Sequence, residues 1–234
     1  MKVAISQPTF FPWQGYFALI DYVDEFVFLD NVQFEKRSWQ QRNYIKVNDN
    51  KKIFTIPVDS KNKSKQKINE VLIDYKNFKV EKFLMLLRHN YKKSNYFDLY
   101  YEKIKKILNK NTLLLSDLNQ DLIKNICLFL KISTPFFKAS SFKLSDDLKN
   151  MDLLRELCKK KNCTKYISTI GGLAYIGNLK KFPDSKIEIK FFEYHEKTYD
   201  QIGKKNISNL SVLDILFNEG PNSLDFIRSS FKII

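Results

Sequence analysis

Residues 3–17 read VAISQPTFFPWQGYF. The apolar run at the start of this stretch passes directly into a polar and aromatic segment with two prolines. A second apolar run, Glu25–Asp30, opens in the same way onto a polar segment at 31–43. Short apolar runs bounded by Pro, Gly and Asp are typical of buried parallel strands, and open α/β sheets bind ligands beyond the carboxyl ends of such strands. The sequence therefore predicts an α/β fold with a mostly parallel sheet and a ligand site at this edge.

The remaining pattern predicts one domain that spans residues 1–234, with a helical insertion or subdomain at about 77–130, where apolar residues recur at helical spacing. Ser211 and Asp214 have the spacing of a capping box at the start of a helix that ends near Phe217. The other expected elements are strands at 53–58, 71–73, 139–142, 166–168 and 187–192, and helices at 152–163 and from 173 onward.

Composition limits the classes of partner. Forty Lys and Arg against 26 Asp and Glu give a net charge of +14, which permits a phosphorylated partner. The lysines are scattered, which favours a solvated surface over a binding patch, and no nucleic-acid module is recognisable, so no nucleic-acid partner is expected. Three cysteines without metal-ligand spacing indicate a reducing compartment and no metal site. We expect a cytoplasmic protein without stable membrane insertion, because no apolar run is long enough to cross a bilayer.

The chain carries a series of motifs in the order found in a known family. On these motifs it resembles the WbqC-like proteins, which occur among genes for bacterial surface polysaccharide, including lipopolysaccharide O-antigen. The motifs are Gln7-Pro8, Pro12–Phe17, Phe28–Asp30, Val32–Phe34, Lys36–Trp39, Arg42-Asn43, Ile45-Lys46, Pro57-Val58, His89, Tyr91, Tyr166–Ser168, Gly171-Gly172, Tyr199, Gln201, Leu210–Asp214 and Phe217–Gly220.

The first strand, the loop Pro12–Tyr16 and the helix after it are similar to the strand-loop-helix start of nucleotidylyltransferases and pantothenate synthetases. Those enzymes hold a nucleotide phosphate with histidines in this loop, whereas this chain has Trp13 and Tyr16 at the same places. An indole offers one neutral donor and a phenol is a weak acid. The resemblance therefore implies a nucleotide-shaped scaffold without adenylyl transfer by the histidine mechanism.

The polar segment after the second strand contains Arg37 and Arg42 on either side of Trp39. The two guanidinium groups would suit a clamp on a phosphate or carboxylate while the indole stacks on a sugar or base. The alternative is a surface hairpin in which the arginine stems pack over the indole. Gln7, after the first strand, would fix a ligand amide or hydroxyl, or else satisfy the backbone next to Pro8.

Two residues are candidates for catalysis. His89, one of two histidines, is a candidate general base, with a buried hydrogen-bond chain as the alternative. Asp30 ends the second strand. The turn at Ser168–Gly172 would bind an anion or would need its glycines for geometry alone. The expected site is catalytic His89 and Asp30 with substrate-binding Gln7, Trp13, Tyr16, Gln33, Arg37, Trp39, Arg42, Asn43, Ser168, Gly171 and Gly172 on two walls of one cleft.

We expect a transferase that attaches an acyl or aminoacyl group to a nucleotide-linked amino sugar, since sugar recognition uses planar polar groups together with aromatic stacking. The partners are then a nucleotide-linked sugar or another phosphorylated small molecule, and an acyl or aminoacyl donor. Because the sequence shows no self-evident nucleophile or metal set, the alternative is a non-catalytic sugar-nucleotide-binding or assembly protein of the same pathway. The oligomeric state is not predicted.

Overall fold

The computed structural model describes residues 1–59, 65–177 and 179–234. Within these residues the main sheet has six strands in the order β10-β9-β8-β1-β2-β7, and all neighbours run parallel except β10 and β9. This confirms the prediction of an α/β fold with a mostly parallel sheet. The strands are β1 (Lys2–Ser6), β2 (Glu25–Phe28), β7 (Phe136–Lys138), β8 (Lys165–Thr169), β9 (Glu188–Tyr194) and β10 (Phe231–Ile233).

The chain reverses its direction of travel across the sheet between β1 and β8. It starts at β1, adds β2 and β7 on one side, and then returns to add β8 and β9 on the other side. The loops after β1 and β8 therefore diverge from adjacent strands and leave a crevice at their carboxyl ends. In open α/β sheets this switch point is where ligands bind.

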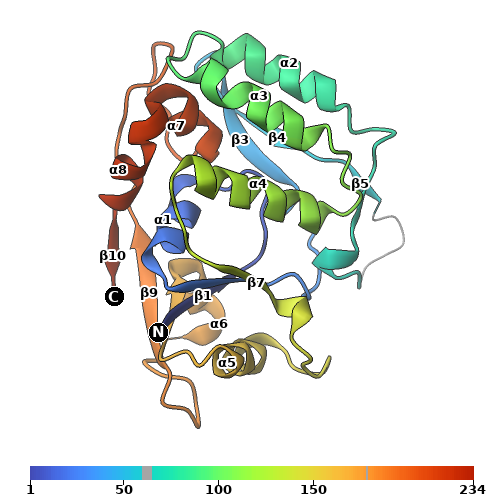
Figure 1. Ribbon diagram of the computed structural model, residues 1–234. Coiled ribbons are helices and arrows are strands. Elements are labelled where there is room, and N and C mark those ends of the chain that lie inside the picture. The colour runs from blue at the N-terminus through green and yellow to red at the C-terminus, as the bar shows by residue number, and fades with distance from the viewer. Residues whose placement is uncertain (60–64, 178) are drawn as a thin grey trace.

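Helices cover both faces of the sheet (Figure 1). The helices α1 (Gln14–Tyr22) and α4 (Leu115–Phe129) lie on one face, and α5 (Asn150–Lys160) and α6 (Leu173–Ile176) lie on the other. Because side chains alternate along a strand, Ala4 joins the apolar core on the first face while its neighbours Val3 and Ile5 join the core on the second. Burial on both faces explains why the parallel strands read as continuous apolar runs.

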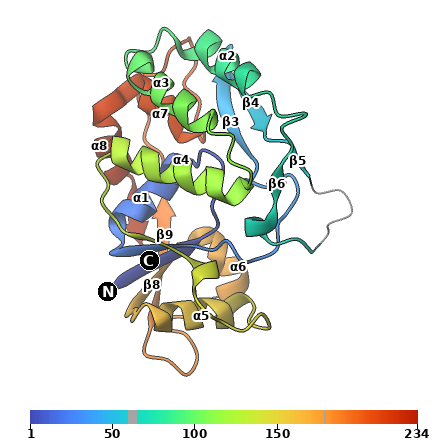
Figure 2. The same ribbon diagram turned by 45° about the vertical axis from the view of Figure 1, so that its right-hand side comes forward.

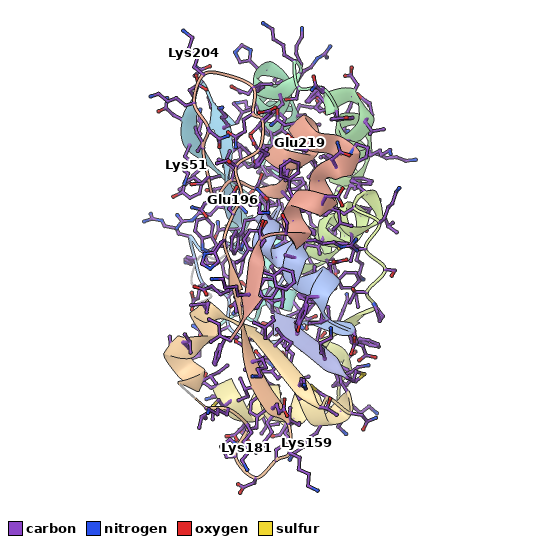
Figure 3. All side chains as sticks on the ribbon, turned by 90° about the vertical axis from the view of Figure 1, so that its left-hand side faces the viewer. Lys51, Lys159, Lys181, Glu196, Lys204 and Glu219 are labelled. Carbon is purple, nitrogen blue, oxygen red and sulfur yellow. The ribbon has the colours of Figure 1, made fainter. Side chains whose placement is uncertain are left out.

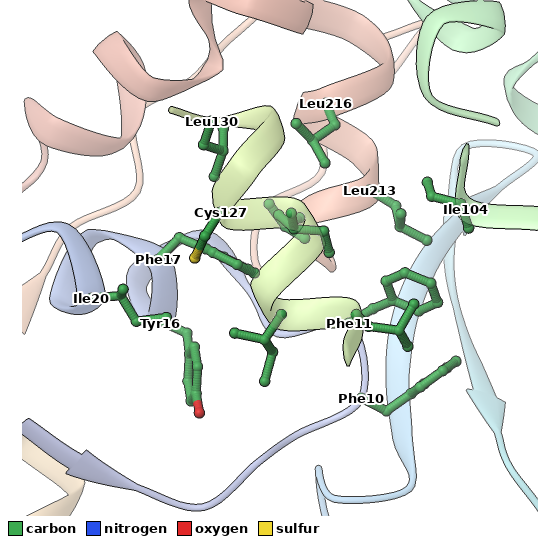
Figure 4. Packing of buried hydrophobic residues seen from close by; sticks show 14 of the residues in the cluster. Phe10, Phe11, Tyr16, Phe17, Ile20, Ile104, Cys127, Leu130, Leu213 and Leu216 are labelled. Carbon is green, nitrogen blue, oxygen red and sulfur yellow. The ribbon is translucent and has the colours of Figure 1, made fainter. Parts of the chain in front are cut away.

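The larger core joins α1, α4 and the C-terminal helix α7 (Val212–Glu219). Figure 4 shows Phe17 and Ile20 of α1, Leu130 after α4 and Leu216 of α7 in one cluster. Phe17 and Ile20 are completely buried, and each such side chain stabilises the fold by roughly 1.5–3 kcal/mol. The N-terminal loop and the C-terminal helix are thus held in one body.

Three helices occupy the segment where a helical insertion or subdomain was expected. They pack on the same apolar core as α1, next to a two-stranded hairpin (Figure 2). The helices are α2 (Val80–Tyr91), α3 (Phe97–Leu108) and α4, and the hairpin is β3 (Arg42–Val47) and β4 (Asn50–Thr55).

The expected strand at 53–58 is divided between two small sheets. β4 ends at Thr55, before Pro57, and Val58-Asp59 form β5, which pairs with β6 (Leu72–Ile73). No helix within residues 1–59, 65–177 and 179–234 is both long and apolar enough to span a bilayer. The remaining elements are α8 (Ser223–Arg228) and the 3-10 turns η1 (Ile68–Glu70), η2 (Ala139–Ser141), η3 (Ile170–Gly172) and η4 (Gly220–Asn222).

The capping box predicted for α7 is wrong. The hydroxyl of Ser211 is buried and has no partner among the described residues. The carboxylate of Asp214 instead accepts hydrogen bonds from the hydroxyls of Tyr91, at 2.9 Å, and Tyr199, at 2.7 Å. Burial raises the pKa of Asp214 above its ordinary value. Asp214 therefore ties α2, the segment before α7 and α7 itself together, and it is not available to the helix terminus.

Candidate functional site

A cavity of about 410 Å³ lies at the carboxyl ends of β1 and β8. It therefore occupies the switch point of the sheet, and its volume is within the usual range for small-molecule sites, roughly 300–1,000 Å³. Residues from both strand ends, from the start of α1, from the start of β3 and from the segment before α7 contribute to it. They are Ser6, Thr9, Pro12, Trp13, Tyr16, Trp39, Asn43, Tyr44, Thr169 and Asn209.

Both tryptophans of the chain line this cavity. Trp13 is 36% exposed and Trp39 is 49% exposed. Trp13 packs edge-on against Tyr194 at 5.1 Å, and Trp39 lies 5.5 Å from the ring of Tyr44. Exposed indoles that are fixed by a second aromatic ring present a rigid apolar face with a polar edge. The cavity therefore offers two stacking surfaces to a planar ring.

The position of Trp13 depends on the glycine two residues later. A Cβ atom at Gly15 would lie 2.5 Å from Cη2 of Trp13, so the indole folds over the bare backbone at the start of α1. No larger residue fits there unless the indole moves. The absence of a side chain at Gly15 thus allows the ring of Trp13 to lie beside the first turn of the helix.

The loop that carries Trp13 is pinned by two asparagines. The Nδ2 atom of Asn43 donates to the carbonyl oxygens of Phe10, at 3.2 Å, and Phe11, at 2.7 Å. Asn119 of α4 donates to the carbonyl of Pro8, at 3.1 Å. Phe11 has a positive φ of 40°, which disfavours a residue with a large side chain. Asn43 thus lines the cavity, and its amide also holds the strained loop in place.

Tyr16 and Gln7 are linked through the backbone. The Tyr16 hydroxyl donates to the Gln7 carbonyl at 3.0 Å, and burial raises the pKa of Tyr16 well above its ordinary value. The Gln7 side chain accepts a hydrogen bond from Gln40 at 2.8 Å. Tyr16 therefore lines the cavity as a protonated phenol, whereas the side chain of Gln7 contributes to a neighbouring hollow.

Neither of the two arginines is in the cavity lining. Arg42 begins β3, and its guanidinium lies 5.9 Å from the ring of Trp39. Its Nε atom is buried and has no partner among the described residues. Arg37 is exposed in a turn with a positive φ of 60° and lies outside the cavity lining. Arg42 thus places its guanidinium over the indole of Trp39, which lines the cavity, and its Nε–H has no partner among the described residues.

Asp30 and Gln33 also lie outside the cavity lining. Asp30 is 1% exposed, and its two oxygens accept from the backbone and the hydroxyl of Ser140, at 2.8 and 2.7 Å. These contacts tie the end of β2 to the end of β7. Gln33 forms an isolated bridge with Lys67 and lines the same neighbouring hollow as Gln7.

The turn after β8 contributes to the opposite wall through one residue. Thr169 lines the cavity, whereas Ser168 is buried and its hydroxyl donates to the Thr169 carbonyl at 3.2 Å. Gly171 and Gly172 follow in η3, beyond the lining. At the predicted opposite wall, Thr169 therefore lines the cavity, whereas the predicted residues Ser168, Gly171 and Gly172 do not.

His89 lies apart from the other predicted residues. It stands near the end of α2 and lines a separate hollow of about 490 Å³ with Lys46 and Tyr91, among others. The cavity at the switch point and this hollow have no lining residue in common. The structure therefore does not bring His89 to the two tryptophans.

Sequence reasoning missed one carboxylate next to the cavity. Glu196 follows β9, accepts a hydrogen bond from the side chain of Gln14 at 2.7 Å and accepts another from the backbone of Asn209, which lines the cavity. Burial raises the pKa of Glu196, and Figure 3 shows it midway between the two ends of the molecule. The rule that placed the site after β1 and β2 also applies to β9 and would have found it. Thr9, Tyr44 and Asn209 carry no such signal.

A model of the WbqC-like protein family matches residues 7–226. The chain belongs to this family. A protein of Mycobacterium tuberculosis, Rv1507c, is 34% identical over 229 residues, which cover 97% of each chain. No solved structure matches. The matched range of this WbqC-like protein contains every one of the described lining residues of the cavity except Ser6.

Proposed function

We propose that this WbqC-like protein is a cytoplasmic transferase of bacterial surface-glycan biosynthesis that attaches an acyl or aminoacyl group to a nucleotide-linked amino sugar. The observation that carries the proposal is the position of both tryptophans in a cavity at the switch point of the sheet. Rings of sugars and bases stack on aromatic faces, and the switch point of an open α/β sheet is where nucleotides bind.

The polar groups of the cavity complement the hydroxyls of a sugar. Thr9, Asn43, Thr169 and Asn209 contribute hydroxyl and amide groups from four different segments. Such groups both donate and accept hydrogen bonds. A few convergent polar groups among aromatic walls are the usual composition of a small-molecule site.

The phosphates of the ligand have two partners in this proposal. Arg42 contributes its guanidinium next to Trp39, where the Nε–H has no partner among the described residues, and an arginine donor forms a charge-assisted hydrogen bond with a phosphate oxygen. The first turn of α1, which has no side-chain cap, adds backbone N–H groups. A strand, a loop and a helix in this arrangement support the nucleotidylyltransferase-like start that the sequence led us to expect.

Transfer to the sugar requires a base. The amine nitrogen forms a bond to the acyl carbon, the bond from that carbon to the leaving group of the donor breaks with its electron pair, and the amine loses a proton. Glu196 is better placed than His89 to accept this proton, because its carboxylate accepts a hydrogen bond from the backbone N–H of Asn209, which lines the cavity. Its raised pKa makes it a stronger base than an ordinary carboxylate.

One observation favours a non-catalytic sugar-nucleotide-binding or assembly protein as the second candidate. Tyr16, Asp30 and Asn43 all make hydrogen bonds that hold the backbone or the strand ends. Turnover with acyl and aminoacyl donors separates the two functions: loss of turnover in Glu196→Gln, with sugar-nucleotide binding retained, supports the transferase. Turnover preserved in Glu196→Gln removes this residue as the base, and absence of turnover with every donor supports the binding protein.

The binding site is tested by calorimetry with UDP-, dTDP-, GDP- and CMP-linked amino sugars. Arg42→Ala should weaken binding by roughly 2–4 kcal/mol, because it removes a charge-assisted hydrogen bond to phosphate. Arg37→Ala is the matched control: it removes the same charge five residues away, from an exposed turn, whereas Arg42 lies over Trp39 of the cavity. Equal losses for the two variants would show a general charge effect and would contradict the assigned site.

A further inference from the structure

A second hollow lies at the same edge of the sheet, beyond the ends of β1 and β2. Its volume is about 370 Å³, and its lining comes from four segments: Gln7, residues 31–35, Lys65 and Lys67, and residues 145–153 at the start of α5. It has no lining residue in common with the cavity that contains the tryptophans. The two are therefore distinct sites.

The charges of the second hollow favour an anion. Three lysines, at 65, 67 and 149, face two carboxylates, Glu35 and Asp146. Lys67 is paired with Asp146 at 2.7 Å, but the Asp146 side chain is 88% exposed. An ion pair this open to water contributes little to stability. An entering anion can replace Asp146, so the hollow is a cationic site with an exchangeable counter-charge.

Two amides add directional hydrogen bonding. Gln7 accepts from Gln40 through its side-chain oxygen, at 2.8 Å, so the half of its amide that remains for a ligand is the donor. The Oδ1 atom of Asn31 is buried and accepts no hydrogen bond from the described residues. Buried carbonyl oxygens normally have a donor. A ligand with both an oxyanion and an N–H or O–H group would satisfy the two amides together.

The two sites are joined by a contact between one residue of each. Gln7 lines the second hollow, and its backbone carbonyl accepts the hydrogen bond from Tyr16, which lines the first cavity. Reacting groups must approach to about 3–3.5 Å. The contact between Gln7 and Tyr16 makes the two sites neighbours, as transfer of a group between their ligands requires.

We propose that the second hollow binds the anionic co-substrate of the same reaction, a phosphorylated or carboxylated donor of the transferred group. This inference rests on the proposed function, because it assigns the second substrate of that transfer. Gln7, Lys67 and Lys149 bind the oxyanion, and Asn31 accepts a hydrogen bond from an amine or hydroxyl of the donor.

Sodium pyrophosphate is the probe, titrated by calorimetry at constant ionic strength. Lys67→Gln and Lys149→Gln should each weaken its binding by about tenfold, the loss expected for one charge-assisted contact. Lys143→Gln is the matched control, since Lys143 is exposed in the segment that precedes α5 and lies outside the hollow. Trp39→Phe should leave pyrophosphate binding unchanged.

Three results would overturn the inference. They are the absence of measurable pyrophosphate binding, equal weakening in Lys143→Gln, and competition between pyrophosphate and the sugar nucleotide for the wild-type protein. Failure of the proposed function gives a different pattern: no sugar nucleotide binds, while pyrophosphate binding still depends on Lys67 and Lys149. In that case the hollow remains an anion site without the assigned reaction.

Discussion

Replacing Asn43 by alanine should uncouple the loop of Trp13 from the hairpin. Asn43 is 7% exposed, and its Nδ2 atom is bonded to the carbonyls of Phe10 and Phe11, which are each 1% exposed. The variant leaves two buried carbonyl oxygens without this donor. Each unsatisfied group costs about 1–3 kcal/mol, and water entering through the cavity offsets part of this, so the expected loss of stability is about 2–4 kcal/mol.

The assay is equilibrium unfolding in urea, together with tryptophan emission of the folded protein. Asn125→Ala is the control, because Asn125 is a half-buried residue of α4 whose amide, among the described residues, donates to Asp121 one turn earlier. Its loss should be less than about 1 kcal/mol. If Asn43→Ala is no more destabilising than Asn125→Ala, or leaves the emission unchanged, the loop is not held by Asn43 and the reasoning fails.

Two further variants test the local geometry. In Gly15→Ala the new Cβ must displace the indole of Trp13, so the tryptophan emission should shift and sugar-nucleotide binding should weaken. The free energy of unfolding should change by no more than about 1 kcal/mol, because alanine favours the helix. Gly171→Ala is the control: its Cβ would be 3.7 Å from Thr169, so the emission should stay unchanged. Asp214 has a raised pKa in the folded state, so its contribution to stability is complete below its unfolded pKa of about 4 and is lost as pH rises through the folded pKa. Urea titrations across this range should show the wild type losing stability relative to Asp214→Asn as pH rises, and a constant difference would contradict the assignment.

The sequence predicted the parallel sheet because burial on both faces leaves a strong signal. Val3–Ile5 and Phe26–Phe28 are apolar without interruption, and that pattern is typical of parallel strands that are buried on both faces. The expected strand at 53–58 shows the opposite case. The segment 50–55 is largely exposed in a two-stranded hairpin, so no burial pattern distinguished a hairpin from a strand of the main sheet.

The candidate site was predictable where its residues directly follow a strand or share the tryptophan-rich loops. Trp13, Tyr16, Trp39 and Asn43 do line one cavity. His89 does not, because helical periodicity gives the buried face of α2 but not the place where that helix packs. Arg37 and Arg42 were read as a pair from their spacing, but the positive φ at Arg37 turns the chain between them.

The capping box at α7 failed for a physical reason of the same kind. The spacing of Ser211 and Asp214 indicates a local hydrogen bond between the Asp214 carboxylate and the helix terminus. Tyr91 and Tyr199, which are distant in the sequence, supply stronger hydrogen-bond donors to the same carboxylate. Two hydrogen bonds from hydroxyls to the buried carboxylate outweigh the single hydrogen bond that it would accept at the helix terminus. Long-range partners of this kind cannot be read from one sequence.

The most direct measurement of the central claim is a tryptophan emission titration with the sugar nucleotide that binds in calorimetry. Because Trp13 and Trp39 are the two tryptophans of the chain, all indole emission reports on the cavity, and Trp13→Phe and Trp39→Phe isolate each ring. The account predicts saturable quenching in the wild type and in each variant, with affinity weakened in at least one by about 1–3 kcal/mol, the value of one aromatic stacking contact. A ligand that binds in calorimetry and leaves the emission of both indoles unchanged would contradict it.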